Sequence, residues 1–326
     1  MGPGHEFDTI RMLMRRWGDL AVDIGDDAAV LPNTGDTVRD RIRVVSTDAC
    51  VEGAHFLRDW ISPYDVGVRS AAAALSDIAA MGARADALLV AFMVPEHWRP
   101  LLGDVADGIA RVVRAAGARI IGGNLSRSDV FAVTTTAIGS ANKRVVSRCG
   151  AIPGDVLVVT GTLGGPGAAT RAWYADQTPS PWASARFAGP SPRLDEGTAL
   201  AVAGAHAMLD ISDGLVADAR HLAAASAVRL QIDAGRVPVG PDISFEAALA
   251  SGEEYELLAA LPVEVAQHVL SEWSSRFSVP LTAIGTVVAV EQGGAVDVVV
   301  DDGAPDSDRN THRRVEFDSG HDHFSR

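Results

Sequence analysis

Short β-branched apolar runs alternate with alanine-rich helical segments along most of this chain of 326 residues. The first three apolar runs have the length and composition of buried strands, at 41–47, 87–94 and 131–139. A well-marked helix lies between the first two, with Ser62 as N-cap, Pro63 at its first position, Asp65 completing a capping box and Gly82 at its end. This alternation predicts a mixed α/β (α+β) fold.

The same pattern continues through the rest of the chain. It predicts helices at 101–116 and 194–207, a loop leading into a helix over 164–175, strands at 156–161, 229–233 and 255–262, and a strand–turn–helix unit over 209–225. A segment rich in Pro and Ser at 175–193 and a polar segment at 301–314 are predicted to be surface loops. A new cycle begins near 145–155, which predicts two domains, 1–147 and 148–326.

Composition limits the classes of partner. The net charge of −14 argues against nucleic-acid binding, which depends on basic patches. Apolar runs are too short to cross a membrane, and the first residues lack a basic segment followed by an apolar one. Cys50 and Cys149 form no CxxC pair, which favours a reduced cytoplasm without disulfides. In so acidic a protein, divalent cations would have to stand between the carboxylates and any phosphate ester.

Acidic side chains gather at predicted strand ends and on one helix. The groups are Asp26 with Asp27; Ser46, Thr47 and Asp48 followed by His55; Asp77; and Asp210 with Asp213. Carboxylates and hydroxyls are the hard oxygen ligands that suit Mg²⁺. A capping role is the alternative for any single aspartate, and Asp213 is a fair N-cap for the helix after it. Asp77 fits that alternative least, because it lies in the middle of an apolar helix.

Two glycine-rich stretches could present backbone N–H groups to phosphate oxygens, at 120–129 and 159–169. Neither contains the Walker pattern GxxxxGK[ST], and Lys143 is the only lysine in the chain. Neither contains GxGxxG, so a Rossmann dinucleotide site has no support. We expect both stretches to be glycine-rich turns, and such turns alone indicate a phosphate site only weakly.

The order and wording of the motifs resemble the thiamine-monophosphate kinase family. The motifs are GDDAAVL, STDACVEGAHF, ALSDIAAMGA, IIGGN, SRCGAIPGDVLVVTGTLG, SPRL, LDISDGL and SGEEYEL, which span residues 25–257. The resemblance implies a two-domain PurM-like fold, whose N-terminal domain forms a β-barrel with its twin in a homodimer. It also implies the final step of thiamine diphosphate biosynthesis, transfer of the γ-phosphoryl group of ATP to thiamine monophosphate in the cytoplasm.

The resemblance also implies roles for individual residues. Family magnesium ligands fall on Asp27, Ser46, Thr47, Asp48, Asp77, Asp210 and Asp213. Nucleotide contacts fall on Gly123, Asn124, Arg148 and Ser212, and substrate contacts on His55 and Glu253. Asp210, Asp213 and Arg148 would carry the catalytic charges, with Mg²⁺ ions bridging aspartates and phosphates.

Two departures from the family pattern affect the expected site. Asn124 stands where the family usually has an aspartate, so one metal site would carry less charge. The tail lacks the tryptophan that contacts the thiamine rings in the family, and Phe317 is the candidate replacement. Alternatives are another ATP-dependent PurM-like enzyme, such as one of the aminoimidazole ribonucleotide synthetase type, and a noncatalytic nucleotide or thiamine-phosphate binding protein.

Overall fold

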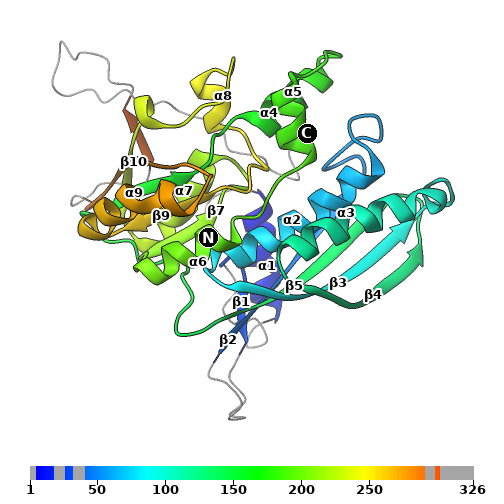
Figure 1. Cartoon of the computed structure of the whole chain (residues 1–326), viewed down its shortest axis with the longest axis horizontal. Helices are drawn as coiled ribbons and strands as arrows, with labels where there is room; N and C mark the ends of the chain where they lie inside the picture. The colour runs from blue at the N-terminus through cyan, green and yellow to red at the C-terminus, as the bar shows by residue number, and fades with distance from the viewer. Residues whose placement is uncertain (1–4, 18–25, 32–40, 291–297, 302–326) are drawn as a thin grey trace.

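A computed structural model describes residues 5–17, 26–31, 41–290 and 298–301. The first half of the chain contains α1 (His5–Trp17), β1 (Ala29–Leu31), β2 (Ile42–Val51), α2 (Pro63–Ala80), β3 (Arg84–Val94), the 3₁₀ helix η2 (Glu96–Leu101), α3 (Leu102–Ala115), β4 (Arg119–Arg127) and β5 (Ala132–Ala141). Its strands form one sheet in the order β1-β2-β5-β3-β4, in which only β3 and β4 are parallel. Figure 1 shows α2 and α3 side by side across this sheet.

The second half forms a separate sheet with helices on both faces. Its elements are β6 (Val156–Thr160), α4 (Gly165–Tyr174), α5 (Pro181–Ala188), α6 (Leu194–Ala203), β7 (Ala207–Asp210), α7 (Leu215–Ser226), β8 (Arg229–Asp233), η3 (Ala234–Arg236), α8 (Phe245–Leu249), β9 (Leu257–Leu261), α9 (Val263–Arg276), β10 (Leu281–Val288) and β11 (Val298–Asp301). The strand order is β11-β8-β10-β6-β9-β7. Alternate strand residues face two cores: Leu157 and Val159 pack with α7, whereas Val158 packs with α6 and α9.

Helix α2 is held close to α3 by two glycines. A Cβ on Gly67 would lie 2.0 Å from the Val105 carbonyl oxygen, and a Cβ on Gly108 would lie 2.0 Å from the Tyr64 carbonyl oxygen. The two backbones are therefore too close for any larger residue at either position. The predicted capping box of α2 is present, with the Ser62 side chain and Asp65 bonded to each other's backbone N–H groups.

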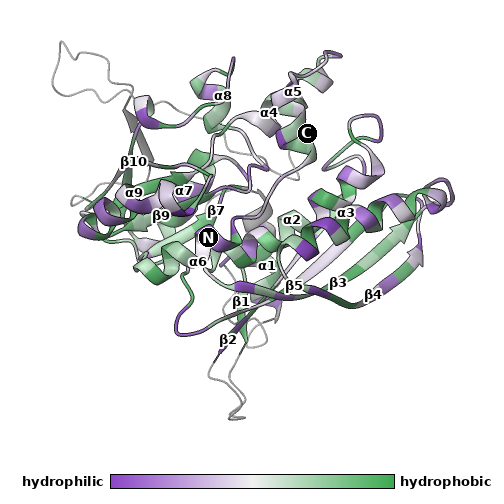
Figure 2. Cartoon of the chain, in the orientation of Figure 1, coloured by the Kyte–Doolittle hydropathy of each residue, from purple (hydrophilic) through white to green (hydrophobic). Residues whose placement is uncertain are grey.

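Helix α2 is buried on nearly all sides because both halves of the chain pack against it. It contacts β2 and β5 of the first sheet, and α6 and β7 of the second half. Its run of alanines at 71–74 is buried, which fits a helix enclosed by neighbours rather than one lying on a surface. Figure 2 shows apolar residues concentrated on the strands of the two sheets, with hydrophilic and apolar residues alternating along the helices around them. This packing brings the end of α2 beside the end of β7.

The structure corrects four expectations at the level of elements. Segment 175–193 is not a plain loop, because Ser180 caps α5 and Phe187 is fully buried. The helix predicted over 194–207 ends at Ala203, where Gly204 adopts a left-handed conformation and leads to β7. Strand β2 continues to Val51, because it pairs with β5 along its whole length. The Gly122-Gly123 pair lies within strand β4, not in a loop.

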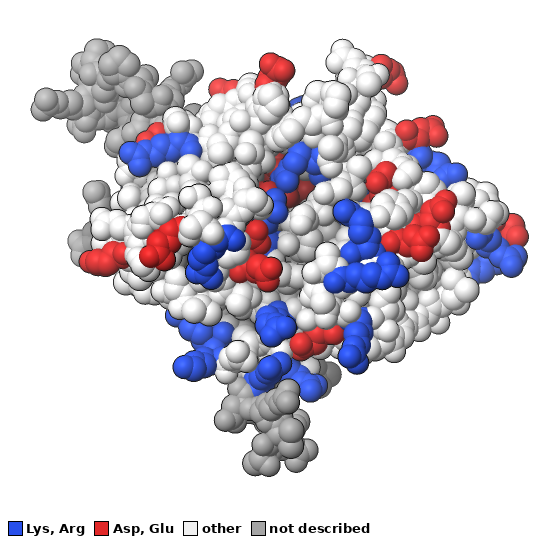
Figure 3. Space-filling model, viewed as in Figure 1, with Lys and Arg blue, Asp and Glu red and all other residues white. Residues whose placement is uncertain are grey.

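The surface of the described residues carries charges of both signs on the face drawn in Figure 3. Among the described helices, none is long and apolar enough to span a membrane. Phe317 lies outside the described residues, as does the segment predicted as a loop at 301–314 apart from Asp301. Their predicted roles stay predictions.

Candidate active site

Three carboxylates from distant parts of the chain meet where the two halves pack together. Asp27 precedes β1, Asp77 lies near the end of α2, and Asp210 is the last residue of β7. One carboxylate oxygen from each lies within 4.8 Å of the other two. We refer to these three side chains together as the carboxylate group. Asp210 is 5% exposed, and the Asp27 side chain is 6% exposed. The structure thus brings together three of the seven residues that the family resemblance implied as magnesium ligands.

Serine hydroxyls orient two of these carboxylates. Ser46 of β2 donates a hydrogen bond to Asp77 Oδ2, and Ser76 of α2 donates one to Asp210 Oδ2 at 2.6 Å. Ser76 and Asp77 are neighbours on α2. One turn of this helix therefore supplies a candidate metal ligand, Asp77, and the hydroxyl that orients a second candidate, Asp210. The fixed position of α2 between the two sheets therefore sets the relative position of Asp77 and Asp210.

Arg148, in the segment joining the two halves, faces the acidic pair before β1. Its guanidinium donates to Asp27 Oδ1 at 2.8 Å, and its backbone N–H donates to Asp26 Oδ1 at 3.0 Å. A nearly buried Arg–carboxylate bond of this kind fixes the orientation of both groups. Arg148 therefore brings the one positive side chain bonded to this carboxylate group among the described residues.

The carboxylate group lacks enough positive charge to be stable when fully ionised. Burial raises the pKa of Asp27 to about 6 against the opposing effect of Arg148, and burial raises the pKa of Asp210 to about 7. Burial, followed by the charge of Asp210, raises the pKa of Asp77 well above its usual range. In addition, Asp27 Oδ2 is buried and has no hydrogen-bond partner among the described residues. This oxygen-only donor set fits a divalent cation such as Mg²⁺.

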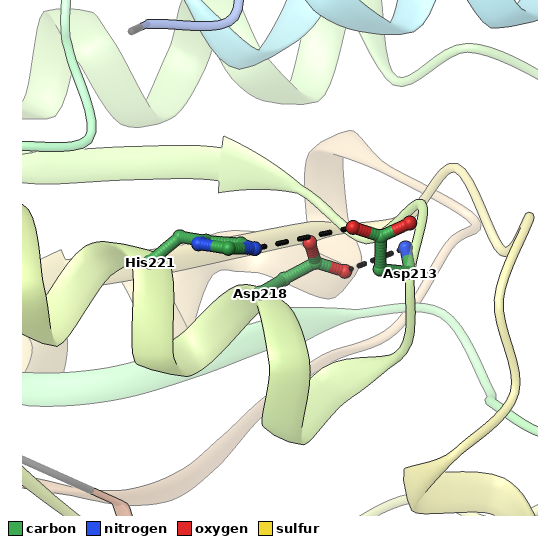
Figure 4. Close-up of side chains that lie close together, drawn as sticks. All are labelled: Asp213, Asp218 and His221. Carbon is green, nitrogen blue, oxygen red and sulfur yellow. Dashed lines mark hydrogen bonds and ion pairs between the residues drawn. The ribbon is translucent and has the colours of Figure 1, made fainter. Parts of the chain in front are cut away.

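The loop after β7 carries Ser212 and Asp213 and is held from within helix α7. Asp218 Oδ2 accepts the backbone N–H groups of Ser212, Asp213 and Gly214 at 3.0, 3.0 and 3.1 Å. Figure 4 shows Asp213, Asp218 and His221 close together, with His221 Nε2 3.9 Å from Asp213 Oδ2. Gly214, not Asp213, is the N-cap of α7, and it has no side chain with which to cap. The capping alternative for Asp213 is therefore wrong, because Asp218 takes over that task.

The side chain of His221 is neutral at neutral pH. Burial, reinforced by the charge of Arg148, lowers its pKa to about 4. Oxygens of Asp213 and Asp218 and a ring nitrogen of His221 lie within 4.8 Å of one another. Asp210 of the carboxylate group and Asp213 of this second group are three residues apart, so the two groups adjoin each other along the loop after β7.

Strand β2 divides its predicted ligands between the two faces of the sheet. Ser46 faces α2, where it reaches Asp77, whereas the Thr47 hydroxyl lies 3.0 Å from that of Thr136 on β5. Because side chains alternate along a strand, Asp48 shares the face of Ser46. Its charge contributes to the raised pKa values of Asp77 and Asp210. The structure thus brings Ser46 and Asp48 to the carboxylate group, and directs the Thr47 side chain elsewhere.

Of the two predicted substrate residues, His55 lies on a turn after β2 and Glu253 lies in the irregular segment before β9. His55 follows β2, and its Nδ1 accepts the Val51 backbone N–H at 3.1 Å, which leaves Nε2 as the protonated nitrogen of a neutral ring. Glu253 adopts a left-handed backbone conformation with φ of 57°, and its N–H donates to the Ser212 carbonyl at 2.7 Å. Segment 253–255 and the loop after β7 are therefore directly bonded.

Arg69 of α2 anchors Glu253 and was not anticipated from the sequence. Its guanidinium bonds to Glu253 Oε1 and to the Phe187 carbonyl, and its carbon Cζ stacks 3.7 Å from the centre of the Phe187 ring. Arg69 is only 2% exposed. The pair joins residues that are 184 positions apart, and a lone arginine on a helix gives no sequence signal for it.

Gly123 and Asn124 lie on β4, at the edge of the first sheet. A Cβ on Gly123 would lie 1.7 Å from the Val90 carbonyl oxygen, so close strand packing already explains this glycine. The Asn124 amide donates to Ser126 Oγ at 2.9 Å. Two strands separate β4 from β2, which places Asn124 about 14 Å from that strand at the usual spacing. The structure does not bring Asn124 to the carboxylate group within one chain.

A buried polar network next to segment 253–255 was also missed. Glu256 is fully buried, and its carboxylate accepts from Arg193 Nε at 2.6 Å, from Arg186 at 2.8 Å and from Thr160 at 2.7 Å. Burial raises the pKa of its neighbour Glu254 to about 7. The only sequence signal was the clustering of acidic residues in SGEEYEL, which does not identify their partners.

Comparison with known proteins agrees with this architecture. Residues 25–141 match the family model of the AIR synthase related protein N-terminal domain, and residues 153–298 match that of the C-terminal domain. Thiamine-monophosphate kinase of Mycobacterium tuberculosis is 39% identical over 76% of this chain and 75% of its own length. Thiamine-monophosphate kinase of Halobacterium salinarum is 36% identical over 88% of this chain and 96% of its own length.

A solved structure gives the same result in three dimensions. AaThiL complexed with AMPPCP and TMP superimposes with a TM-score of 0.78 and 29% identity, covering 90% of this chain and 93% of that chain. The two domain matches extend from residue 25 to residue 298, a range that contains every motif singled out from the sequence. The chain belongs to the thiamine-monophosphate kinase family, within the two-domain PurM-like fold.

Proposed function

We propose that this chain transfers the γ-phosphoryl group of ATP to thiamine monophosphate, forming thiamine diphosphate and ADP. The observation that carries the proposal is the buried group of Asp27, Asp77 and Asp210 beside Arg148, in a chain of this family. Relatives over most of the chain are named for this kinase activity, and the solved AaThiL complex contains AMPPCP and TMP.

Mg²⁺ is the proposed cofactor of this site. Asp27, Asp77 and Asp210 would bind the cations, together with Ser46 and Asp48 on β2 and Asp213 on the loop after β7. We keep Thr47 as a proposed ligand through its backbone carbonyl oxygen, because its side chain bonds to Thr136. When bound, the cations would neutralise the charge of the phosphates and of the carboxylates, which the chain alone does not balance.

The chain's own residues would orient the two substrates. Arg148 supplies a fixed charge beside Asp27 toward the nucleotide, and Ser212 lies on the loop next to Asp213. Gly123 and Asn124 remain proposed nucleotide contacts, reached by a different part of ATP or in a different protomer. On the substrate side, His55 offers its Nε2–H as a donor, Glu253 is held by Arg69, and Phe317 stays a prediction.

Phosphoryl transfer here needs no strong general base. The attacking atom is a phosphate oxygen of thiamine monophosphate, already ionised near neutral pH. Its new bond to the γ-phosphorus replaces the bond from that phosphorus to the oxygen that leaves with ADP. No phosphoenzyme is required, and the role of the protein is to position and stabilise charge.

We further propose a homodimer formed through the first sheet. All nine residues of β4 are exposed, and β1 and β4 are the two edges of the sheet among the described residues. Exposed apolar side chains on these strands and on β3 are 36% to 66% exposed: Val30, Leu31, Leu89, Ile120, Ile121 and Leu125. Such edges require a partner or a cover. We also keep the proposed division into domains 1–147 and 148–326.

The test is a chromatographic assay of purified protein with thiamine monophosphate, ATP and Mg²⁺, measuring thiamine diphosphate and ADP together. We expect equal amounts of both products, none with EDTA, and loss of at least 100-fold on Asp210→Asn. Asp233→Asn is the matched control, because this exposed carboxylate caps η3 and pairs with Arg236. ADP alone would indicate another acceptor. Nucleotide binding without either product would indicate a noncatalytic binding protein.

A further inference from the structure

Three consecutive backbone N–H groups in the loop after β7 converge on one oxygen atom. Ser212, Asp213 and Gly214 donate to Asp218 Oδ2 at 3.0 to 3.1 Å. Asp218 belongs to the first turn of α7 and is 4% exposed. Its backbone N–H donates to the Gly214 carbonyl at 3.0 Å, as expected for a residue inside the helix. Figure 4 shows one of these three bonds, from the Asp213 N–H to Asp218. Because Asp218 is almost fully buried, the bonds that it accepts are shielded from solvent.

Convergent N–H groups at the start of a helix are the arrangement by which proteins bind phosphates and other anions. In this loop the anion is a carboxylate of the protein itself. While Asp218 occupies this position, the three N–H groups are satisfied and do not bind a phosphate of the nucleotide. The loop therefore contributes to the site through its side chains rather than through its amides.

The other side of the same loop is fixed by segment 253–255, which precedes β9. Tyr255 N–H donates to the Ile211 carbonyl at 2.9 Å, and Glu253 N–H donates to the Ser212 carbonyl at 2.7 Å. Carbonyl groups of the loop are thus held by residues 253–255, and its N–H groups are held by Asp218. Between these two sets of bonds, little freedom remains for Asp213, which follows Ser212.

We propose that Asp218 is a positioning residue for phosphoryl transfer, which sets the orientation of Asp213 and of the Ser212 backbone through their amides. This inference rests on the proposed function, because it assumes that Asp213 meets a cation. Asp218 itself would touch neither substrate nor product. Groups that orient metal ligands in this way commonly change metal affinity or activity about 10- to 100-fold when removed.

The test compares Asp218→Ala with Asp218→Asn in the full-length protein. Asn keeps a side-chain oxygen that can accept the three N–H groups but removes the charge, whereas Ala removes both. We expect the half-saturating Mg²⁺ concentration to rise about 10-fold or more in Asp218→Ala. In Asp218→Asn, the fold-increase should be smaller than in Asp218→Ala by a factor of at least about five. Equal losses in Ala and Asn would overturn the proposal, because they would show that the loss follows the charge of Asp218 and not its hydrogen bonds to the loop.

Two readouts do not depend on catalysis. Hydrogen exchange of residues 212–214 should accelerate in Asp218→Ala, and the rise in Tm caused by Mg²⁺ alone should shrink. Asp155→Asn is the matched control. Asp155 is 2% exposed, accepts the Ile152 N–H at 2.9 Å and lies near the start of β7 rather than its end. It should lower Tm without changing exchange in the loop or the Mg²⁺ requirement.

The outcomes separate this proposal from the proposed function. Faster exchange and a smaller Mg²⁺ effect in Asp218→Ala support positioning even if the wild-type protein forms no thiamine diphosphate. Unchanged exchange and an unchanged Mg²⁺ requirement in a folded Asp218→Ala overturn positioning even if the wild-type protein is an active kinase. If Asp218→Ala does not fold, Asp218→Asn carries the test, because a neutral amide oxygen accepts the three N–H groups more weakly than a carboxylate does. Faster exchange of residues 212–214 in Asp218→Asn than in the wild type, with no change in Asp155→Asn, then supports the proposal. Exchange equal to that of the wild type overturns it.

Discussion

At the scale of single residues, the site is an excess of buried negative charge that the chain does not neutralise. The raised pKa values of Asp27, about 6, and Asp210, about 7, follow chiefly from burial. In the unfolded chain an aspartate has a pKa of about 3.9. Both groups therefore bind protons more tightly when the protein is folded. Their stabilising contribution is complete below about pH 4 and is lost as the pH rises toward 7.

Because the pKa values are raised in the folded protein, the Tm of the metal-free protein and the rise in Tm caused by Mg²⁺ should change in opposite directions with pH. The Tm of metal-free protein should fall between pH 5 and pH 8, and the rise in Tm caused by Mg²⁺ should grow over the same interval. For each carboxyl group that must lose its proton, Mg²⁺ affinity gains about tenfold per pH unit below the pKa. Differential scanning fluorimetry at several pH values measures both. A Mg²⁺ effect of equal size at pH 5.5 and pH 8 would contradict the prediction.

A second residue-scale prediction concerns the hydroxyl that supports Asp210. Ser76→Ala removes the 2.6 Å donor to Asp210 Oδ2, which favours the protonated carboxyl and should weaken Mg²⁺ binding about tenfold at pH 7. Ser70→Ala is the control on the same helix, because Ser70 is also buried but its hydroxyl donates to the Val66 carbonyl. Titration of Mg²⁺ against initial rate measures both. Equal losses of Mg²⁺ affinity in the two variants would contradict the prediction, because they would show that the loss comes from altered packing of α2.

At the scale of elements, α2 holds the site together through its contacts on two sides. Gly67→Ala places a Cβ 2.0 Å from the Val105 carbonyl, so α2 and α3 must separate. We expect a loss of about 2–3 kcal/mol in the free energy of unfolding. Gly103→Ala, on α3 where nothing lies within 4 Å, should be neutral or stabilising by up to about 1 kcal/mol. Urea denaturation decides this, and a neutral Gly67→Ala would show that the helices can separate freely.

The sequence predicted elements well where local signals act alone. The capping box of α2 and the turn at Gly82 depend on neighbouring residues, and both are present. Helix α5 was missed although Ser180 and Pro181 begin it, because the Pro and Ser content of the segment suggested a loop. Asp77 could be singled out, since a carboxylate on an apolar helix needs a partner. Asp218 could not, because an acidic residue in a first helical turn is ordinary.

At the scale of the whole molecule, the site depends on two sheets whose facing elements are far apart in sequence. Asp77 and Ser46 come from the first half, Asp210 comes from the second, and Arg148 comes from the segment between them. No local pattern specifies that meeting. It follows from α2 packing against β7 and α6, and only the resemblance to a family pointed to it from the sequence.

The proposed dimer gives the last prediction. Ile121 on β4 is 58% exposed beside other exposed apolar residues, so an arginine there would place a charge in the proposed interface. Val202→Arg is the control, since Val202 on α6 is 83% exposed and belongs to the other half of the chain. Light scattering after gel filtration should give twice the 34.0 kDa of one chain for the wild-type protein and Val202→Arg, and 34.0 kDa for Ile121→Arg. A dimeric Ile121→Arg would move the interface off this strand, and a monomeric wild-type protein would remove it, because the exposed edges of the sheet would then need no partner.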